Sequence, residues 1–178
     1  MAMDDKGDIV LAGSSISPDY PLTPGAYGAD AGPFLVKAVV TRMSLLPEGV
    51  VRLGDSTPGC HGALLLGVLS QPRLGATDFG IYAGNAAPNA SLGALLVGLS
   101  AASSPAHLHQ AEIWLDPASL AVVIPWSADA TGYVEVPARI PDDSVLVGLQ
   151  AWIQGVFKDP CAPGHVAATP ALGLVIQP

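Results

Sequence analysis

Short apolar stretches alternate with turn-forming residues along almost the whole chain. Runs of about four to nine residues rich in Val, Leu, Ile and Ala lie between Gly, Pro, Asp and Asn, which is typical of short β-strands joined by turns. No stretch predicts a convincing helix. The expected strands are Asp8 to Ala12, Phe34 to Leu46, Val50 to Leu53, Ala63 to Leu69, Asp78 to Ala83, Gly93 to Leu99, Ala111 to Leu115, Ala121 to Trp126, Gly132 to Arg139, Val145 to Lys158 and Ala171 to Ile176.

This spacing predicts an all-β fold, a two-sheet antiparallel β-sandwich of the jelly-roll kind. The residues from Tyr133 to Ile140 and from Leu149 to Phe157 alternate between apolar and polar, so each segment is expected to show one face to a core and one to water. Ala63 to Leu66 and Leu95 to Val97 are continuously apolar, which predicts central strands covered on both sides.

The chain is expected to have two parts. Residues 13–33 contain Ser, Pro, Gly, Tyr and Asp without periodicity, which is typical of an extended surface arm. We therefore expect residues 1–33 to form an N-terminal strand and arm, and residues 34–178 to form the sandwich domain.

Charge and composition exclude some partners. The chain has 178 residues, which suffices for one hydrophobic core. It contains 7 Lys and Arg residues and 15 Asp and Glu residues, which gives a net charge of −8. No basic cluster is present, which argues against nucleic acid and against electrostatic binding to an anionic membrane. The longest apolar runs fall far short of the roughly 20 residues that a membrane span needs. Met1 to Asp8 lacks the features of a signal peptide.

Only two cysteines are present, Cys60 and Cys161. Their separation excludes a CxxC redox or zinc motif and leaves either a disulfide or two free thiols. A disulfide closing so long a loop would contribute on the order of 4 kcal/mol by the chain-entropy argument.

A series of short motifs carries a family resemblance. Their order covers roughly Gly54 to Pro178, and each is weak alone. The motifs are Gly54-x-x-Thr57-Pro58-Gly59-Cys60-x-Gly62, Leu66-Gly67-Val68, Pro72-x-x-Gly75, Asn85-Ala-Ala-Pro88, Leu115-Asp116-Pro117, Ile140-Pro141-Asp142, Leu146-Val-Gly-Leu149-x-x-x-Trp152 and Ala171-Leu-Gly-Leu-Val-Ile-Gln177.

In this order the region resembles the uncharacterised β-rich C-terminal domains of secreted proteins from planctomycetes and myxobacteria. The resemblance implies an extracellular all-β module without an established catalytic site. It also implies that Cys60 and Cys161 form a disulfide. The chain departs from the family at its first fifty residues, which replace the usual partner domain.

A serine hydrolase is one alternative. Gly54-Asp55-Ser56 would hold the nucleophile, Gly84-Asn85 an oxyanion donor, and Asp159 with His165 an acid–base pair. Such a serine needs a strand-to-helix turn, whereas Pro58 and Gly59 follow Ser56 and lead into an apolar run. A turn in which Asp55 and Ser56 bond local backbone N–H groups is favoured, so we expect no enzyme activity.

Metal ligands are the next candidates. His107 and His109 would project to one side of a strand and bind zinc or copper with a third ligand from elsewhere, the candidates being His165, His61 and Glu112. Two surface histidines flanking an inward Leu108 explain the pattern equally well. Asp142 and Asp143, like Asp4 and Asp5, are weak calcium candidates without the ligand spacing of a known loop. We expect no cofactor.

Aromatic side chains suggest a carbohydrate-binding alternative, because sugar rings stack on exposed aromatic faces. In a chain with 6% aromatic residues, most of them are expected to fill the core instead. Asn89-Ala90-Ser91 is an N-glycosylation triplet, which often arises by chance. The candidates for a glycan groove are Trp114, Trp126, Trp152, Tyr82 and Tyr133.

The N-terminal strand suggests assembly. Ile9, Val10 and Leu11 are apolar and precede the arm, so they could complete the sheet edge of a neighbouring subunit, or pack on their own domain. The sequence thus predicts a non-enzymatic, extracellular structural or adhesive module that contacts its own copies or other surface or matrix proteins. A lectin-like domain is the alternative. A hydrolase is the third, and it requires Ser56 and His165 within hydrogen-bond reach.

Overall fold

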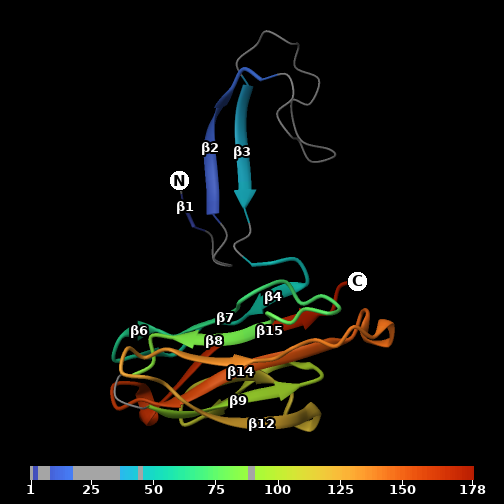
Figure 1. Cartoon of the computed structure of the whole chain (residues 1–178). Helices are drawn as coiled ribbons and strands as arrows, with labels where there is room; N and C mark the ends of the chain where they lie inside the picture. Colours follow the sequence, from blue (N-terminus) through green and yellow to red (C-terminus); the bar gives the residue numbers. More distant parts are fainter. Residues whose placement is uncertain (1, 4–8, 18–36, 44–45, 88–90) are drawn as a thin grey trace. The chain divides into compact units, whose positions relative to one another are not determined.

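The computed structural model describes residues 2–3, 9–17, 37–43, 46–87 and 91–178. These residues form β-strands and three short 3-10 helices (Figure 1). The chain divides into two compact units, Met1–Leu45 and Leu46–Pro178. The predicted all-β, sandwich-like fold is confirmed. No helix in the described part of the chain is long and apolar enough to cross a membrane.

The first unit contains one small antiparallel sheet. Its order is β1 (Ala2–Met3), β2 (Ile9–Ser15) and β3 (Lys37–Met43). Strand β2 lies in the middle, with Val10 opposite both Ala2 and Arg42. The sequence predicted that the sandwich domain begins at residue 34. Strand β3 instead pairs with β2 over seven residues and belongs to the first unit. Most of the predicted arm, residues 18–33, lies outside the described residues.

The second unit is built on a five-stranded antiparallel sheet with a smaller sheet against it (Figure 1). The large sheet has the order β12 (Leu120–Ser127), β9 (Leu92–Gly98), β14 (Gln150–Lys158), β15 (Val166–Val175) and β4 (Val50–Leu53). The small sheet has the order β13 (Val134–Pro137), β8 (Gly80–Gly84) and β7 (Leu65–Val68). Two hairpins complete the unit, β5 (Pro58–Gly59) with β6 (Gly62–Ala63) and β10 (Ala101–Leu108) with β11 (Ala111–Leu115).

The main core lies between the two sheets. Leu95, Phe157 and Leu172 of the large sheet pack with Ile81 and Ala83 of the small one. Burying such apolar side chains is the dominant favourable term in folding, at about 1.5–3 kcal/mol for each large side chain. The stability of the sandwich therefore depends mainly on the packing between its two sheets.

A second core covers the other face of the large sheet. Ala111, Ile113 and Leu115 of β11 pack against Ala168 and Ala171 of β15. The middle of the large sheet is thus covered on both sides, as the run from Leu95 to Val97 predicted.

Strand β7 differs from its prediction. It lies at the edge of the small sheet, and Leu64 is buried whereas Ala63 and Leu65 are exposed. The prediction of a central strand covered on both sides is therefore wrong. Strand β7 has one neighbouring strand and packs only one face against the core, so alternate side chains are exposed to water.

Two local predictions were also wrong. Strand β10 was not predicted, since Ser103, Ser104 and Pro105 favour a turn; the structure accommodates them at an irregularity in the pairing of β10 with β11. Val145 begins no strand. The Asp143 side chain caps a 3-10 helix, η2 (Ser144–Leu146), and Gly148 takes a positive φ of 79° before β14 starts.

Candidate functional site

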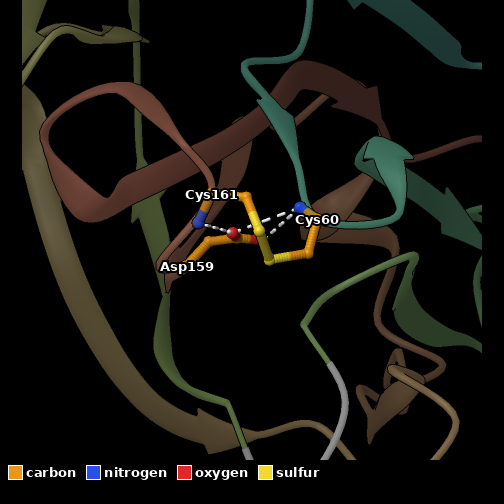
Figure 2. Close-up of side chains that lie close together, drawn as sticks. All are labelled: Cys60, Asp159 and Cys161. Atoms are coloured by element: carbon orange, nitrogen blue, oxygen red, sulfur yellow. Dashed lines mark hydrogen bonds between the residues drawn. A yellow bond between two sulfur atoms is a disulfide. The ribbon is translucent and has the colours of Figure 1, made fainter.

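The two cysteines form the disulfide that the family resemblance implied (Figure 2). Thr57 donates its N–H to the Ala168 carbonyl at 2.8 Å, which ties the segment before Cys60 to β15. The β5–β6 hairpin then places Cys60 in its turn, with the Cα atoms of Cys60 and Cys161 4.9 Å apart. This separation lies within the ordinary range for a disulfide.

Asp159 lies beside the disulfide and is 1% exposed. Its carboxylate accepts hydrogen bonds from the N–H of Cys60 at 3.1 Å and of Cys161 at 2.9 Å (Figure 2). A Cβ atom on Gly59 would collide with Asp159 Oδ2, so only glycine fits there. A buried carboxylate is costly unless it accepts hydrogen bonds. By accepting from both cysteine N–H groups, Asp159 joins the two segments that carry Cys60 and Cys161. We call Cys60, Asp159 and Cys161 the clasp.

The hydrolase residues do not form the predicted constellation. The carboxylate of Asp159 accepts from the two cysteine N–H groups, and its backbone N–H donates to the carbonyl of His165 at 3.1 Å. It therefore does not orient the His165 imidazole as a triad acid does. Asn85 has a positive φ of 63° and donates its side-chain amide to the Ala63 carbonyl.

The clasp is also where metal-ligand side chains meet. Within the described residues, Cys60, Asp159 and Cys161 are the one group of three whose ligand atoms lie within 4.8 Å of one another. Metals bind cysteine as a thiolate, and here both sulfurs are in the disulfide. In this oxidised state the clasp is a crosslink.

The two histidines of the predicted metal site do not project from one strand. Strand β10 ends at Leu108, and His109 and Gln110 form a two-residue turn with φ of 49° and 74°. That turn redirects His109 away from the strand that carries His107, so this part of the prediction is wrong. Gly164 packs against His109. This contact brings the 3-10 helix η3 (Pro163–His165) beside the turn.

The other polar candidates serve local structure. Asp143 accepts from the Val145 N–H at 3.1 Å as the cap of η2, and Asp142 is exposed. Ser91 is buried and donates to the Lys158 carbonyl, whereas Asn89 of the glycosylation triplet lies outside the described residues.

The three tryptophans are packing residues. Trp126 is buried in the main core and stacks on Phe157, with ring centroids 5.1 Å apart. Trp114 and Trp152 pack against the second core, on the opposite face of the large sheet. The three indoles therefore do not line one groove.

Tyr82 and Tyr133 remain as a partly exposed stacked pair, with centroids 5.9 Å apart. The Tyr133 hydroxyl donates to Glu135 Oε2 at 2.8 Å, which raises the pKa of Tyr133. In the turn before Tyr133, the Thr131 hydroxyl donates to the Asp129 carboxylate, and this bond, together with N–H donors from Tyr133 and Thr131, lowers the pKa of Asp129.

Gln154 is a buried polar residue that no motif in the sequence singles out. Its Nε2 donates to the Glu112 and Thr169 carbonyls and its Oε1 accepts from the Trp114 N–H, all at 2.8 Å. Gln154 thereby joins β11, β14 and β15. The available signal was its position two residues from both Trp152 and Val156, which places it on a packed face.

Strand β12 forms one of the two edges of the large sheet in the part of the chain that the structure describes, and β4 forms the other. The residues of β12, Leu-Ala-Val-Val-Ile-Pro-Trp-Ser, carry no charge, and Leu120, Val122 and Val123 are exposed. An exposed apolar edge with unpaired backbone groups is a template for pairing with another chain. The sequence predicted a strand here but not its position at an edge.

Comparisons of the chain with protein families, with curated proteins and with solved structures found no match. The resemblance to the planctomycete and myxobacterial domains stays a prediction.

Proposed function

We propose that this chain is a non-enzymatic, extracellular structural module that associates with a second copy of itself through strand β12. The observation that carries the proposal is the uncharged, exposed edge from Leu120 to Val123. The disulfide supports an oxidising, extracellular location, because such bonds persist mainly outside the cytosol.

A second copy suits this edge for two reasons. Two β12 strands that pair antiparallel around a two-fold axis between Val122 and Val123 bring Val122 of each copy opposite Val123 of the other, a closed isologous contact. The chain has a net charge of −8, yet β12 has no charged side chain, so self-pairing brings no like charges together at the strand itself. Pro125 lacks an N–H donor, which confines the pairing to the segment before it.

The predicted exchange of the N-terminal strand is less favoured. Ile9 and Val10 have partner strands on both sides within their own chain. Donating β2 to a neighbour would first require breaking these pairs. The carbohydrate-binding alternative keeps Tyr82 and Tyr133 as its candidates, since the tryptophans are packed.

The test is the Val123→Lys variant of the full chain. Lysine on an edge strand opposes pairing, so sedimentation velocity over a wide concentration range is expected to show association of the wild type and a monomeric variant. Val145→Lys is the matched control, because it adds the same charge at an exposed residue outside the strands. Urea unfolding of both variants checks the fold.

Four results would contradict the proposal or favour one of its alternatives. A wild type that stays monomeric throughout removes it, as does equal loss of association in both variants. Association that survives Val123→Lys but is lost in Leu11→Lys assigns the contact to the N-terminal strand. Retention on a glycan array that Tyr82→Ala abolishes favours the carbohydrate-binding alternative.

A further inference from the structure

Two open hollows meet at Lys158, where β14 ends. The first has a volume of about 250 Å³ and is lined by apolar residues that include Leu92, Ala94, Leu108 and Val156. The second, of about 460 Å³, is lined by Pro160, Gly164 and His165 among others. Lys158 and Val166 line both hollows. We call the two together the Lys158 groove.

The lining of the first hollow is mainly apolar. Leu92 is 58% exposed and Leu108 42% exposed, although they belong to different elements, β9 and β10. Small-molecule sites are typically mostly apolar concavities with a few placed polar groups. The composition of this hollow matches that description.

Lys158 supplies the polar group. It is exposed and forms no ion pair within the part of the chain that the structure describes. Its neighbour Asp159 is no counter-ion, because that carboxylate is buried and accepts hydrogen bonds from Cys60 and Cys161. An unpaired ammonium beside an apolar hollow favours an anionic ligand with an apolar body.

Both turns beside the groove hold non-glycine residues in the left-handed region. His109 and Gln110, directly after Leu108, have φ of 49° and 74°, and His165 has φ of 61°. Positive φ at both central residues is what a two-residue hairpin turn requires, and it fixes the turn after Leu108 beside the groove. Gly164 packs on His109 and thus joins the two turns.

The pairing of the two main strands beside the groove, β9 and β14, favours a hydrocarbon chain over a peptide. A bound peptide strand needs free backbone donors and acceptors at a sheet edge. Strand β9 lies between β12 and β14, and β14 lies between β9 and β15, so these two strands already have partners on both sides, whereas β10, which contributes Leu108, pairs with β11 alone. A hydrocarbon chain needs no such groups.

We propose that the Lys158 groove binds a fatty acid. The hydrocarbon chain lies over Leu92, Leu108 and Val156, and the carboxylate pairs with the Lys158 ammonium. This site is separate from the β12 edge and does not depend on the proposed function.

Isothermal titration calorimetry of the full chain with dodecanoate, below its micelle concentration, tests the proposal. Dodecanoate is expected to bind, and dodecyltrimethylammonium, with the same chain and opposite charge, is not. Lys158→Gln is expected to weaken dodecanoate binding about tenfold, the effect of one lost charge-assisted contact. Arg139→Gln is the control for charge, as an exposed cation that does not line the groove.

Leu92→Ser tests the apolar hollow. It is expected to weaken dodecanoate binding severalfold, while Leu99→Ser, at a leucine of similar exposure outside the groove, leaves it unchanged. The proposal is overturned if dodecanoate does not bind, if the cationic analogue binds equally well, or if Lys158→Gln has no effect. Preferential binding of an apolar hexapeptide would assign the groove to peptides instead.

Discussion

The two edges of the large sheet are built differently. Strand β4 has four residues and carries Arg52, which lies 3.8 Å from the Asp55 carboxylate. The chain then runs from β4 to the clasp, where Cys60 is bonded to Cys161. Strand β12 has eight residues, no charge and no crosslink. One edge is short, charged and tied to its own chain, whereas the other is long and apolar.

Because of this difference, we expect the β4 side to affect the stability of the fold and β12 to affect its association. Short length and charge are the devices by which natural sheets prevent pairing with other chains, and the β4 edge has both. The buried polar side chains Asp159 and Gln154 accept or donate hydrogen bonds within the fold. Substitutions at the clasp are therefore expected to change the free energy of unfolding, and substitutions on β12 to change the oligomeric state.

The largest expected effect is loss of the crosslink. In the Cys60→Ala/Cys161→Ala variant, the loop of sequence separation 101 is no longer closed. The chain-entropy argument gives a loss of about 4–5 kcal/mol in the free energy of unfolding, measured by urea denaturation. A loss below about 1 kcal/mol would show that the clasp contributes little to the free energy of unfolding.

Asp159→Asn has the next largest effect. The amide has an NH2 donor in place of Oδ2, which accepts from the Cys60 N–H at 3.1 Å, and it lacks the charge that strengthens the hydrogen bonds to Oδ1 from Cys60 and Cys161. Charge-assisted hydrogen bonds contribute about 1.5–3 kcal/mol each, so a loss of about 2 kcal/mol is expected. Asp116→Asn, which also removes a carboxylate that accepts a backbone N–H, but at a less buried position, is the control and is expected to lose less.

The smallest expected effect on stability is that of Arg52→Val. The ion pair with Asp55 is exposed, so the free energy of unfolding is expected to change by no more than about 0.5 kcal/mol. The variant makes the β4 edge uncharged, which sharpens the comparison. If sedimentation shows that Arg52→Val associates as strongly through β4 as the wild type does through β12, charge and not length distinguishes the edges.

The fold class could be predicted because turn residues divide the chain at nearly every strand boundary. Strand β10 could not, since Ser103 and Pro105 favour a turn locally and only pairing with β11 makes them part of a strand. Local propensity gives way there to tertiary context.

The candidate sites depend on contacts between distant segments. The role of Gln154 follows from the placement of Glu112 and Trp114 over it, and the Lys158 groove requires Leu92 and Leu108 to converge from separate strands. No local pattern contains such information. The disulfide was foreseen because the resemblance, and not the spacing of Cys60 and Cys161, implied it.

The clasp closes the chain between residues 60 and 161 into a covalent ring. A protease that cuts one exposed turn within this ring, such as that at His109 and Gln110, opens the ring without releasing a fragment. The nicked molecule stays one covalent species and can keep its two cores together. For a protein exposed to proteases, the crosslink thus converts a cut that would otherwise divide the chain into a local break.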